Sequence, residues 1–362
     1  MSLRFCIIAL FSAFIFAGCQ NNTGANSNSN KPKARGTLGE IILVIDSAKY
    51  AGPVGDALKN VFESNIEGLI REESMFYMRK VDPRKMTRIL KMAANIIFVT
   101  TFDDKRGGSR NIANQFTPES IEKSKADSSL FMLRNQDEFA VGQEVLYLFG
   151  ENEPELIKNL EANKQLLQNL FSNKEKEILS TALFSRKNGE VAEMGKQKFG
   201  VKLNLPASYQ FVKEEENFIW CRQPTPRVDK PDISLFFYQT AYVDESQVFP
   251  ENIIKLRDEI TRHTIFGDPD KPESFLVTEK QIPPVFKNIR IDGQYSTEMR
   301  GAWKTNNLSM GGSFLSYTVV DEEKGKIFYM EGFVYYPNEA HRASLREVET
   351  ILQATKFRME AE

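Results

Sequence analysis

The sequence contains few of the residues on which most metal and nucleophilic sites depend. Its 362 residues include two histidines, His263 and His341, and three cysteines. Zinc, haem and Ser-His-Asp sites draw on histidine or cysteine, so this scarcity excludes most of them. P-loop, Rossmann, HExxH, CxxC and EF-hand patterns do not occur after the N-terminal segment. We therefore expect neither a cofactor nor a metal ion.

The charge of the chain is nearly balanced, with 47 Lys and Arg residues against 49 Asp and Glu residues and a formal net charge of -2. So little net charge creates no strong field to attract nucleic acid, and we expect no nucleic-acid partner. Hydrophobic residues make up 41% and charged residues 27% of the chain, which is typical of globular proteins. The length favours two domains over one.

The N-terminal segment has the pattern of a signal peptide over residues 1–18. Arg4 precedes the apolar run Phe5–Phe16, which is shorter than the roughly 20 residues that a membrane-spanning helix needs. The small residues and cysteine of Ala17-Gly18-Cys19 then resemble the lipobox of bacterial lipoproteins, whose cysteine is lipidated and becomes the new N-terminus. We expect lipidation at Cys19. A plain signal peptide cut elsewhere and an uncleaved anchor are the alternatives.

Residues 19–36 are predicted to be the lipidated cysteine and a flexible tether. Gln20–Arg35 is almost without apolar residues, so it cannot bury enough surface to offset the entropy of ordering. Such a tether holds a folded body near a membrane with a root-mean-square span of roughly 20–24 Å. In enterobacterial lipoproteins an aspartate after the lipidated cysteine favours retention in the inner membrane, but this chain has Gln20 there. No acidic run follows Cys19 either. Both features favour the outer membrane, facing the periplasm. Only Cys221 then remains, which excludes an internal disulfide.

Residues 37–186 are predicted to form an α/β layered domain. Apolar runs at Ile41–Ile45 and Ile96–Val99 are typical of buried strands. A helix is expected at Glu153–Phe171, and the capping-box pattern Ser172-x-x-Glu175 predicts that another begins there. The order β-α-β-α-β, followed by further α and β elements, places helices over a sheet.

The polar segment 187–198, which holds two glycines, is predicted to be a linker to an α+β domain over 199–357. This second domain is expected to have a mainly antiparallel sheet covered by helices, followed by a tail at 358–362. The expected strands are 202–205, 217–222, 233–241, 294–303, 312–320 and 326–335, and the expected helices are 250–263 and 339–355.

Three carboxylates follow apolar strands of the first domain and form a candidate site. Asp46 ends one strand, and Asp103 and Asp104 end another. Ligands of open α/β sheets bind beyond the carboxyl ends of the strands, so these side chains converge if their strands are neighbours. A converged set binds a divalent cation or acts as acid and base. Loop capping and solvent exposure are the alternative interpretation.

Charged and aromatic residues inside predicted strands of the second domain form a candidate ligand pocket. Glu298 and Arg300 alternate in one strand, so they share a face and are able to pair with each other or with Arg222. Arg222 shares the face of its own strand with Trp220, and Trp303 ends the strand of Glu298. Because buried charge is costly unless it is paired, these residues either line a polar pocket or fix the strand register.

Six short motifs carry a family resemblance. They are Ala17-Gly18-Cys19, NLPASYQ at 204–210, NFIWCRQ at 217–223, EMRGAW at 298–303, MGGSF at 310–314 and EGFVYYP at 331–337. Together they resemble a family of uncharacterised Bacteroidetes lipoproteins that is defined only as a domain of unknown function. The resemblance covers nearly the whole chain and implies an envelope lipoprotein with no catalytic site. The second half is also similar, by strand order and its Leu-Pro entry, to the α+β domains of the PsbP and Mog1 type.

These observations predict a lipid-anchored cell-envelope protein that is a non-catalytic binding or assembly module, with an envelope protein or ligand as its partner. One alternative is a carboxylate-dependent envelope hydrolase that uses Asp46, Asp103 or Glu298, which requires a deep pocket and carboxylates with shifted pKa values. Another is a small-ligand carrier with a pocket in the second domain.

Overall fold

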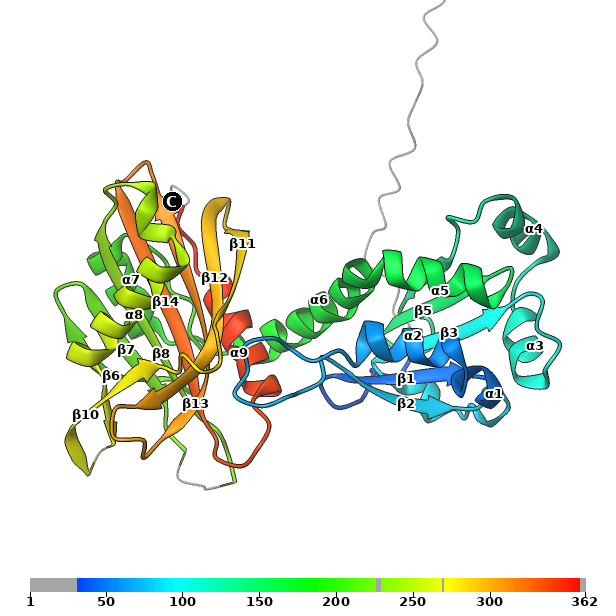
Figure 1. Ribbon diagram of the computed structural model, residues 1–362, viewed down its shortest axis with the longest axis horizontal. Helices are drawn as coiled ribbons and strands as arrows, with labels where there is room; N and C mark the ends of the chain where they lie inside the picture. Colours follow the sequence, from blue (N-terminus) through cyan, green and yellow to red (C-terminus); the bar gives the residue numbers. More distant parts are fainter. Residues whose placement is uncertain (1–30, 226–228, 269, 359–362) are drawn as a thin grey trace, which may run out of the picture. The chain divides into compact units, whose positions relative to one another are not determined.

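Two sheets organise the part of the chain that the structure describes (Figure 1). The computed structural model describes residues 31–225, 229–268 and 270–358. The predicted signal peptide, Cys19 and the predicted tether up to residue 30 lie outside these ranges. The first sheet is an α/β sheet with helices, and the second is a curled antiparallel sheet with helices, which confirms the predicted fold class. Both sheets belong to one compact unit that begins at Pro32.

The first sheet has the strand order β2-β1-β3-β5-β4. Its strands are β1 (Glu40–Ile45), β2 (Tyr77–Val81), β3 (Asn95–Thr101), β4 (Met132–Gln136) and β5 (Glu144–Gly150). The first three and β5 run parallel, whereas β4 pairs with β5 in the antiparallel sense. The chain passes from β1 outward to β2 and then back across β1 to β3. The carboxyl ends of β1 and β3 therefore mark the place where open sheets of this kind bind ligands.

Helices and 3-10 turns cover both faces of the first sheet. They are α1 (Ser47–Tyr50), α2 (Pro53–Phe62), η1 (Pro83–Lys85), η2 (Leu90–Met92), α3 (Gly107–Ala113), α4 (Pro118–Ala126), α5 (Glu153–Ala162) and α6 (Lys164–Leu183). Leu58 of α2, Leu156 of α5 and Phe171 of α6 pack in the core on one face. Ile112 of α3 packs in a separate core on the other face.

The break between α5 and α6 lies at Asn163, not at Ser172 as the capping-box pattern predicts. Asn163 ends α5, and its Nδ2 donates to the carbonyl of Asn159 at 2.9 Å. Ser172 is buried in the interior of α6, and Glu175 binds Arg342 instead of a helix N-terminus. The Ser-x-x-Glu spacing therefore reflects a tertiary ion pair, which sequence spacing alone does not distinguish from a cap.

The second sheet has the strand order β6-β7-β8-β14-β13-β12-β10-β9, and β11 pairs with β12 beside this path. The strands are β6 (Gln210–Glu215), β7 (Phe218–Gln223), β8 (Asp232–Ala241), β9 (Phe266–Asp268), β10 (Lys271–Thr278), β11 (Val285–Ile291), β12 (Gln294–Thr305), β13 (Gly311–Asp321) and β14 (Lys326–Tyr335). The sheet curls strongly. The ring centroids of Trp220 in β7 and Phe266 in β9 are 5.1 Å apart, although these strands stand near opposite ends of the order.

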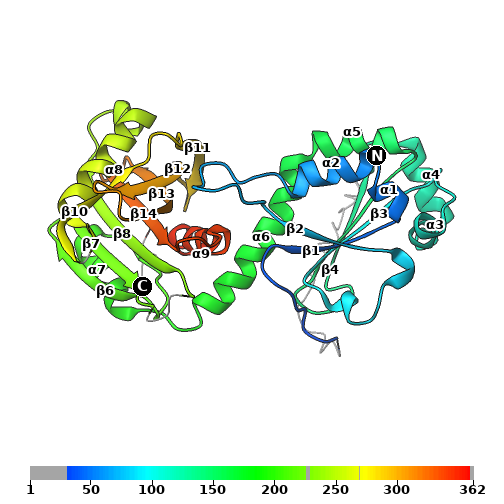
Figure 2. The ribbon, with the colours of Figure 1, turned by 60° about the horizontal axis from the view of Figure 1, so that its bottom comes forward.

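The two faces of the second sheet are covered by different helices (Figure 2). The helical elements are α7 (Gly189–Phe199), η3 (Glu245–Val248), α8 (Pro250–Thr264) and α9 (Arg342–Gln353). Val348 of α9 and Val191 of α7 pack on one face. Ile253 and Ile260 of α8 pack on the other, inside the curl. Among the described residues, the structure contains no helix with the length and apolar character needed to span a membrane.

The segment predicted as a linker over 187–198 is mostly helix α7. Asn188 caps this helix by accepting from the N–H of Val191 at 3.1 Å, and Gly200 follows its end with a φ of +66°. Val191 and Phe199 are buried in the core of the second sheet. Because only a narrow stripe of the helix is apolar, the polar remainder and the two glycines made the segment resemble a linker.

The sequence does not predict β6, β9, β10 or β11. The residues of β6 are mostly exposed, so this strand has no buried apolar face that would indicate it. In β11 only Ile291 is buried, and its other residues are exposed or half-buried. The predicted strand at 202–205 forms only an isolated bridge between Lys202 and Lys356. Its apolar residues Leu203 and Leu205 are buried in the core without joining the sheet.

Candidate functional site

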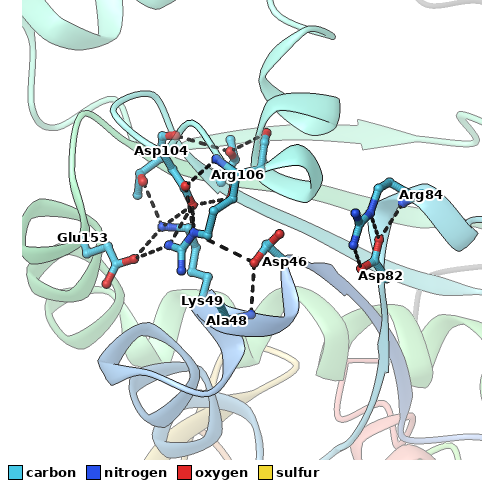
Figure 3. A network of polar contacts seen from close by, with 11 residues as sticks. Asp46, Ala48, Lys49, Asp82, Arg84, Asp104, Arg106 and Glu153 are labelled. Carbon is cyan, nitrogen blue, oxygen red and sulfur yellow. Dashed lines mark hydrogen bonds and ion pairs between the residues drawn. The ribbon is translucent and has the colours of Figure 1, made fainter.

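The carboxyl ends of β1 and β3 hold a network of ion pairs (Figure 3). Asp46 follows β1 and caps α1 by accepting from the N–H of Ala48 at 3.0 Å. Asp104 follows β3 at the same edge, so the structure brings these two predicted site residues into one network. Asp103 is exposed and outside the network, and its backbone N–H donates to the carbonyl of Glu151 at 3.0 Å.

Lys49 and Arg106, which sequence reasoning missed, connect these carboxylates. The side chain of Lys49 is fully buried, and its Nζ lies 2.8 Å from Glu153 Oε1 and 3.3 Å from Asp104 Oδ2. Arg106 binds Asp104 at 2.8 Å and Glu153 at 3.1 Å. Its Nε lies 3.9 Å from Asp46 Oδ1. The sequence feature that could have pointed to Lys49 is its position, because it follows Asp46 within one helical turn at the end of a strand.

This network keeps Asp104 ionised. Burial raises the pKa of the Asp104 carboxyl, but hydrogen bonds from Arg106 and Ser109 outweigh burial and hold it well below the ordinary value of 3.8. A carboxyl group that stays ionised near neutral pH is a poor general acid. Within the described part of the chain, no group of three or more His, Cys, Asp or Glu side chains is arranged to hold a metal ion. The ion pairs of this network therefore stabilise the fold by holding together the segments that follow β1 and β3.

A large polar pocket lies beside α6, β11, β12 and α9, with a volume of about 690 Å³. This volume falls within the roughly 300–1,000 Å³ of small-molecule sites. The residues Ser64–Glu67 complete its wall. Six basic side chains and four acidic ones line it, namely Lys164, Lys176, Lys287, Arg290, Arg300 and Arg346 against Glu67, Asp292, Glu298 and Glu349. Charged walls of both signs suit a polar ligand.

Glu349 of α9 holds three of these basic side chains in place. The carboxylate of Glu349 lies 2.8 Å from a guanidinium nitrogen of Arg346, 3.4 Å from Lys176 Nζ and 3.5 Å from a guanidinium nitrogen of Arg300. Burial raises the pKa of Glu349, but the charges of Arg346, Arg300 and Lys176 outweigh burial and lower it to about 2. Arg300 also binds Glu298 at 2.7 Å. The part of the pocket wall around Glu349 is therefore held by ion pairs before any ligand enters, which lowers the entropic cost of binding there.

The four residues predicted to line one ligand pocket divide between two cavities. Glu298 and Arg300 pair with each other and line the large pocket. Arg222 and Trp303 line a smaller cavity on the other face of the sheet. Trp303 is an odd number of positions from both Glu298 and Arg300, so the alternation of β12 sends it to the opposite face. Arg222 binds Asp232 instead, with Nε 2.8 Å from Oδ1. The structure thus corrects the expectation of a single pocket.

The smaller cavity lies inside the curl of the second sheet and has a volume of about 40 Å³. Its walls include Trp220, Phe266 and Trp303, and the ion pair of Arg222 and Asp232 stands beside these rings. The cavity therefore combines aromatic surface with a few polar groups, but it is far smaller than the roughly 300–1,000 Å³ of small-molecule sites.

Cys221 is a buried core residue without a disulfide partner. Burial raises the pKa of its thiol to about 12, and the charge of Glu190 adds to the shift. Because the thiolate is the reactive form, this cysteine is inert near neutral pH.

Two family models match consecutive parts of the chain. Residues 34–184 match Domain of unknown function (DUF8532), and residues 188–354 match Domain of unknown function (DUF4837). Two domains of unknown function thus cover nearly the whole chain, which supports the resemblance to an uncharacterised domain family. No curated protein matches the sequence.

Several solved structures are distantly similar to less than half of the chain. LpqN, which is involved in cell envelope biogenesis of Mycobacterium tuberculosis, has 14% sequence identity and a TM-score of 0.27 over 43% of this chain and 82% of LpqN. The Ran-binding protein Mog1p of Saccharomyces cerevisiae has 9% identity and a TM-score of 0.27 over 44% of this chain and 92% of Mog1p. A protein from Bacteroides thetaiotaomicron has 10% identity and a TM-score of 0.24 over 45% of this chain and 46% of that protein. Matches at this level say nothing about function.

Proposed function

We propose that this protein is a lipid-anchored, non-catalytic binding module of the bacterial cell envelope, and that its large pocket binds a polar ligand. The single observation that carries the proposal is the pocket of about 690 Å³ beside α6, β11, β12 and α9. Its size suits a small molecule, and ion pairs with Glu349 hold three of its six basic side chains in place.

The anchor is proposed from the N-terminal sequence. Ala17-Gly18-Cys19 has the order of a lipobox, and the polar segment Gln20–Arg35 has the composition of a tether. Lipid attached to Cys19 would hold the folded body at a membrane, with Gln20 favouring the outer membrane and the periplasmic side. The binding pocket would then face the periplasm within reach of that membrane.

The carboxylate network at the ends of β1 and β3 counts against a hydrolase that uses these strand ends, because Asp46 caps α1 and Asp104 is a poor general acid. Asp104 is tied to Lys49 and Arg106, and its pKa lies well below the ordinary value. A catalytic acid needs a pKa near the working pH, which calls for the opposite environment.

Site-specific photocrosslinking in intact cells tests the binding role. Asn173 is an exposed residue of α6 on the pocket wall, and Asn114 is an exposed residue at the end of α3 outside the pocket. Replacing each in turn by benzoylphenylalanine gives a matched pair of probes. We expect irradiation to produce a specific adduct at position 173 and none at 114. The absence of an adduct at 173, or identical adducts at both positions, would contradict a ligand in this pocket.

A further inference from the structure

Most carboxylates on the wall of the large pocket are already paired with basic side chains. Glu298 and Glu349 bind three of the six basic side chains of the wall, namely Arg300, Arg346 and Lys176. Asp292 binds Lys356, which lies outside the wall, at 3.0 Å. Glu67 is the one carboxylate of the wall that has no ion pair with a residue in the described part of the chain.

The other three basic side chains of the wall form no ion pair with any residue that the structure describes. Lys164 of α6 donates to the side-chain amide of Asn60 at 3.1 Å, and Arg290 of β11 donates to the carbonyl of Gly293 at 3.0 Å. Both acceptors are uncharged. The third side chain is Lys287 of β11. Three cations therefore stand against one unpaired carboxylate, and this excess of positive charge attracts an anion.

The unpaired cations are accessible to a ligand. Lys287 and Arg290 are exposed, and Lys164 is half-buried. Lys287 is the register partner of Glu298 across the ladder of β11 and β12, but that carboxylate accepts from Arg300 instead, at 2.7 Å. An anion that enters the pocket therefore meets these side chains without breaking an ion pair.

The chemistry of the free donors favours a phosphate group over a carboxylate. A planar carboxylate is recognised best by the paired N–H groups of an arginine. In this pocket Arg300 gives its Nε to Glu298 at 2.7 Å, and Arg346 gives its Nη1 to Glu349 at 2.8 Å. Two of the three free cations are lysines, whose ammonium groups act as point charges. A tetrahedral phosphate suits such donors, because its oxygens accept from several directions.

The rest of the wall suits a hydrophilic molecule. Within the described part of the chain, no aromatic side chain lines this pocket. Exposed amides of Asn65 and Asn173 lie on the wall, together with the hydroxyl-bearing Ser64. Amides and hydroxyls both donate and accept hydrogen bonds, as the hydroxyl groups of a polyol do. A polyol that carries a phosphate group therefore matches both parts of the wall.

We propose that the large pocket binds a phosphate ester of a small polyol, whose negative charge is balanced by Lys164, Lys287 and Arg290. This inference rests on the proposed function, because it names the chemical class of the polar ligand for the same pocket. A sugar phosphate and a glycerophosphate share this chemistry.

Isothermal titration calorimetry of the full-length protein tests the class of ligand. The probes are glucose 6-phosphate for the sugar source and glycerol 3-phosphate for the glycerol source. Glucose and glycerol are the matched neutral controls, and glucuronate is the matched carboxylate control. We expect at least one phosphate ester to bind, and its controls to have a Kd higher by about tenfold or more. The probe that binds identifies the source.

Two variants test the assigned cations. Lys164→Gln and Lys287→Gln should each raise the Kd of the active probe roughly three- to tenfold, because each removes a positive charge that has no partner within the described chain. Neither change breaks an ion pair, so both proteins should fold as the native protein does. Lys123→Gln is the matched control on α4, where the side chain is 69% exposed and outside the pocket, and it should leave the Kd unchanged.

Three results would overturn the proposal. One is that neither phosphate ester binds. Another is that a neutral polyol or glucuronate binds as tightly as the phosphate esters. The third is that both pocket variants bind like the native protein, or that Lys123→Gln weakens binding as much as they do. A photocrosslinked adduct at Asn173 without phosphate binding would overturn only this ligand class, whereas the absence of that adduct would contradict the proposed function itself.

Discussion

Arg257 illustrates how single buried charges are accommodated inside the curl of the second sheet. Its side chain is fully buried, and it binds Glu331 through two contacts of 2.9 Å. Its Nη1 donates to Thr278 Oγ1 at 3.1 Å, and the hydroxyl of Tyr329 donates to Glu331 at 2.6 Å. Its guanidinium carbon lies 4.0 Å from the centre of the Phe314 ring. Each charged group therefore has several partners, as burial in a low dielectric requires.

Arg257→Met should lower the free energy of unfolding by about 3–5 kcal/mol, because it leaves the buried Glu331 carboxylate without its counter-charge. The double variant Arg257→Met with Glu331→Leu should lose less than the single variant, since it removes both charges together. Urea denaturation followed by circular dichroism measures both values. If the double variant is the less stable of the two, the ion pair contributes net stability and this reasoning is wrong.

At the scale of elements, α9 depends on the ionised state of Glu349. The pKa of this carboxyl is lowered from 4.5 to about 2 in the folded protein, because the nearby basic side chains outweigh burial. A carboxyl whose pKa is depressed by folding stabilises the protein above its unfolded pKa. That stabilisation is lost as pH falls from about 4.5 towards 2.

Glu349→Gln should therefore weaken the pH dependence of stability in acid. Between pH 5 and pH 2, the free energy of unfolding of the native protein should fall by about 3 kcal/mol more than that of the variant. Urea denaturation at a series of pH values measures this difference. Parallel curves for the two proteins would show that Glu349 titrates alike in the folded and unfolded chains.

A substitution at Gly195 of α7 tests whether this segment is a packed helix or a linker. A Cβ at this position would lie 2.5 Å from Leu203 Cγ, whereas a Cβ at Gly189 in the same helix would meet nothing within 4 Å. Gly195→Ala should therefore destabilise the protein by about 1–3 kcal/mol through overpacking, despite the better helix propensity of alanine. Gly189→Ala should be neutral or slightly stabilising. Thermal unfolding of both variants is the measurement, and a stabilised Gly195→Ala protein would mean that α7 does not pack here.

The elements that could be predicted from the sequence are those whose own residues determine them. β1 and β3 were predictable because an apolar run of β-branched residues is buried on both faces. The helix α7 was not, because its apolar stripe is narrow and its packing on Leu203 is a tertiary feature. The break at Asn163 was missed for the same reason, since Ser172 and Glu175 serve contacts with a distant helix.

The candidate sites were predictable only in part. The juxtaposition of Asp46 and Asp104 follows from strand order, but the buried position of Lys49 does not, because a lysine after a strand is usually solvated. The pairing of Glu298 with Arg300 follows from alternation. The large pocket could not be predicted, because it needs β11, which the sequence does not indicate, and residues of α6 that are far away in the chain.

At the scale of the whole molecule, the proposed anchor sets where the protein acts. Cys19→Ala should abolish incorporation of radiolabelled palmitate and move the protein from the membrane fraction to the soluble fraction, because the thiol that carries the lipid is gone. Cys221→Ala is the matched control and should keep both the label and the membrane location, since this thiol is buried. Palmitate labelling that persists in Cys19→Ala would place the lipid on another residue.

The ion pair between Glu175 and Arg342 bears on how the protein is made. Both side chains are buried, and their nitrogen and oxygen lie 2.8 Å apart. The two residues are 167 positions apart in the chain. A ribosome that has finished α6 must therefore still add the entire second sheet before the acid obtains its base. Until α9 is made, Glu175 on α6 of the nascent chain lacks its partner Arg342. A shortened product that ends before α9 would leave Glu175 without this partner permanently.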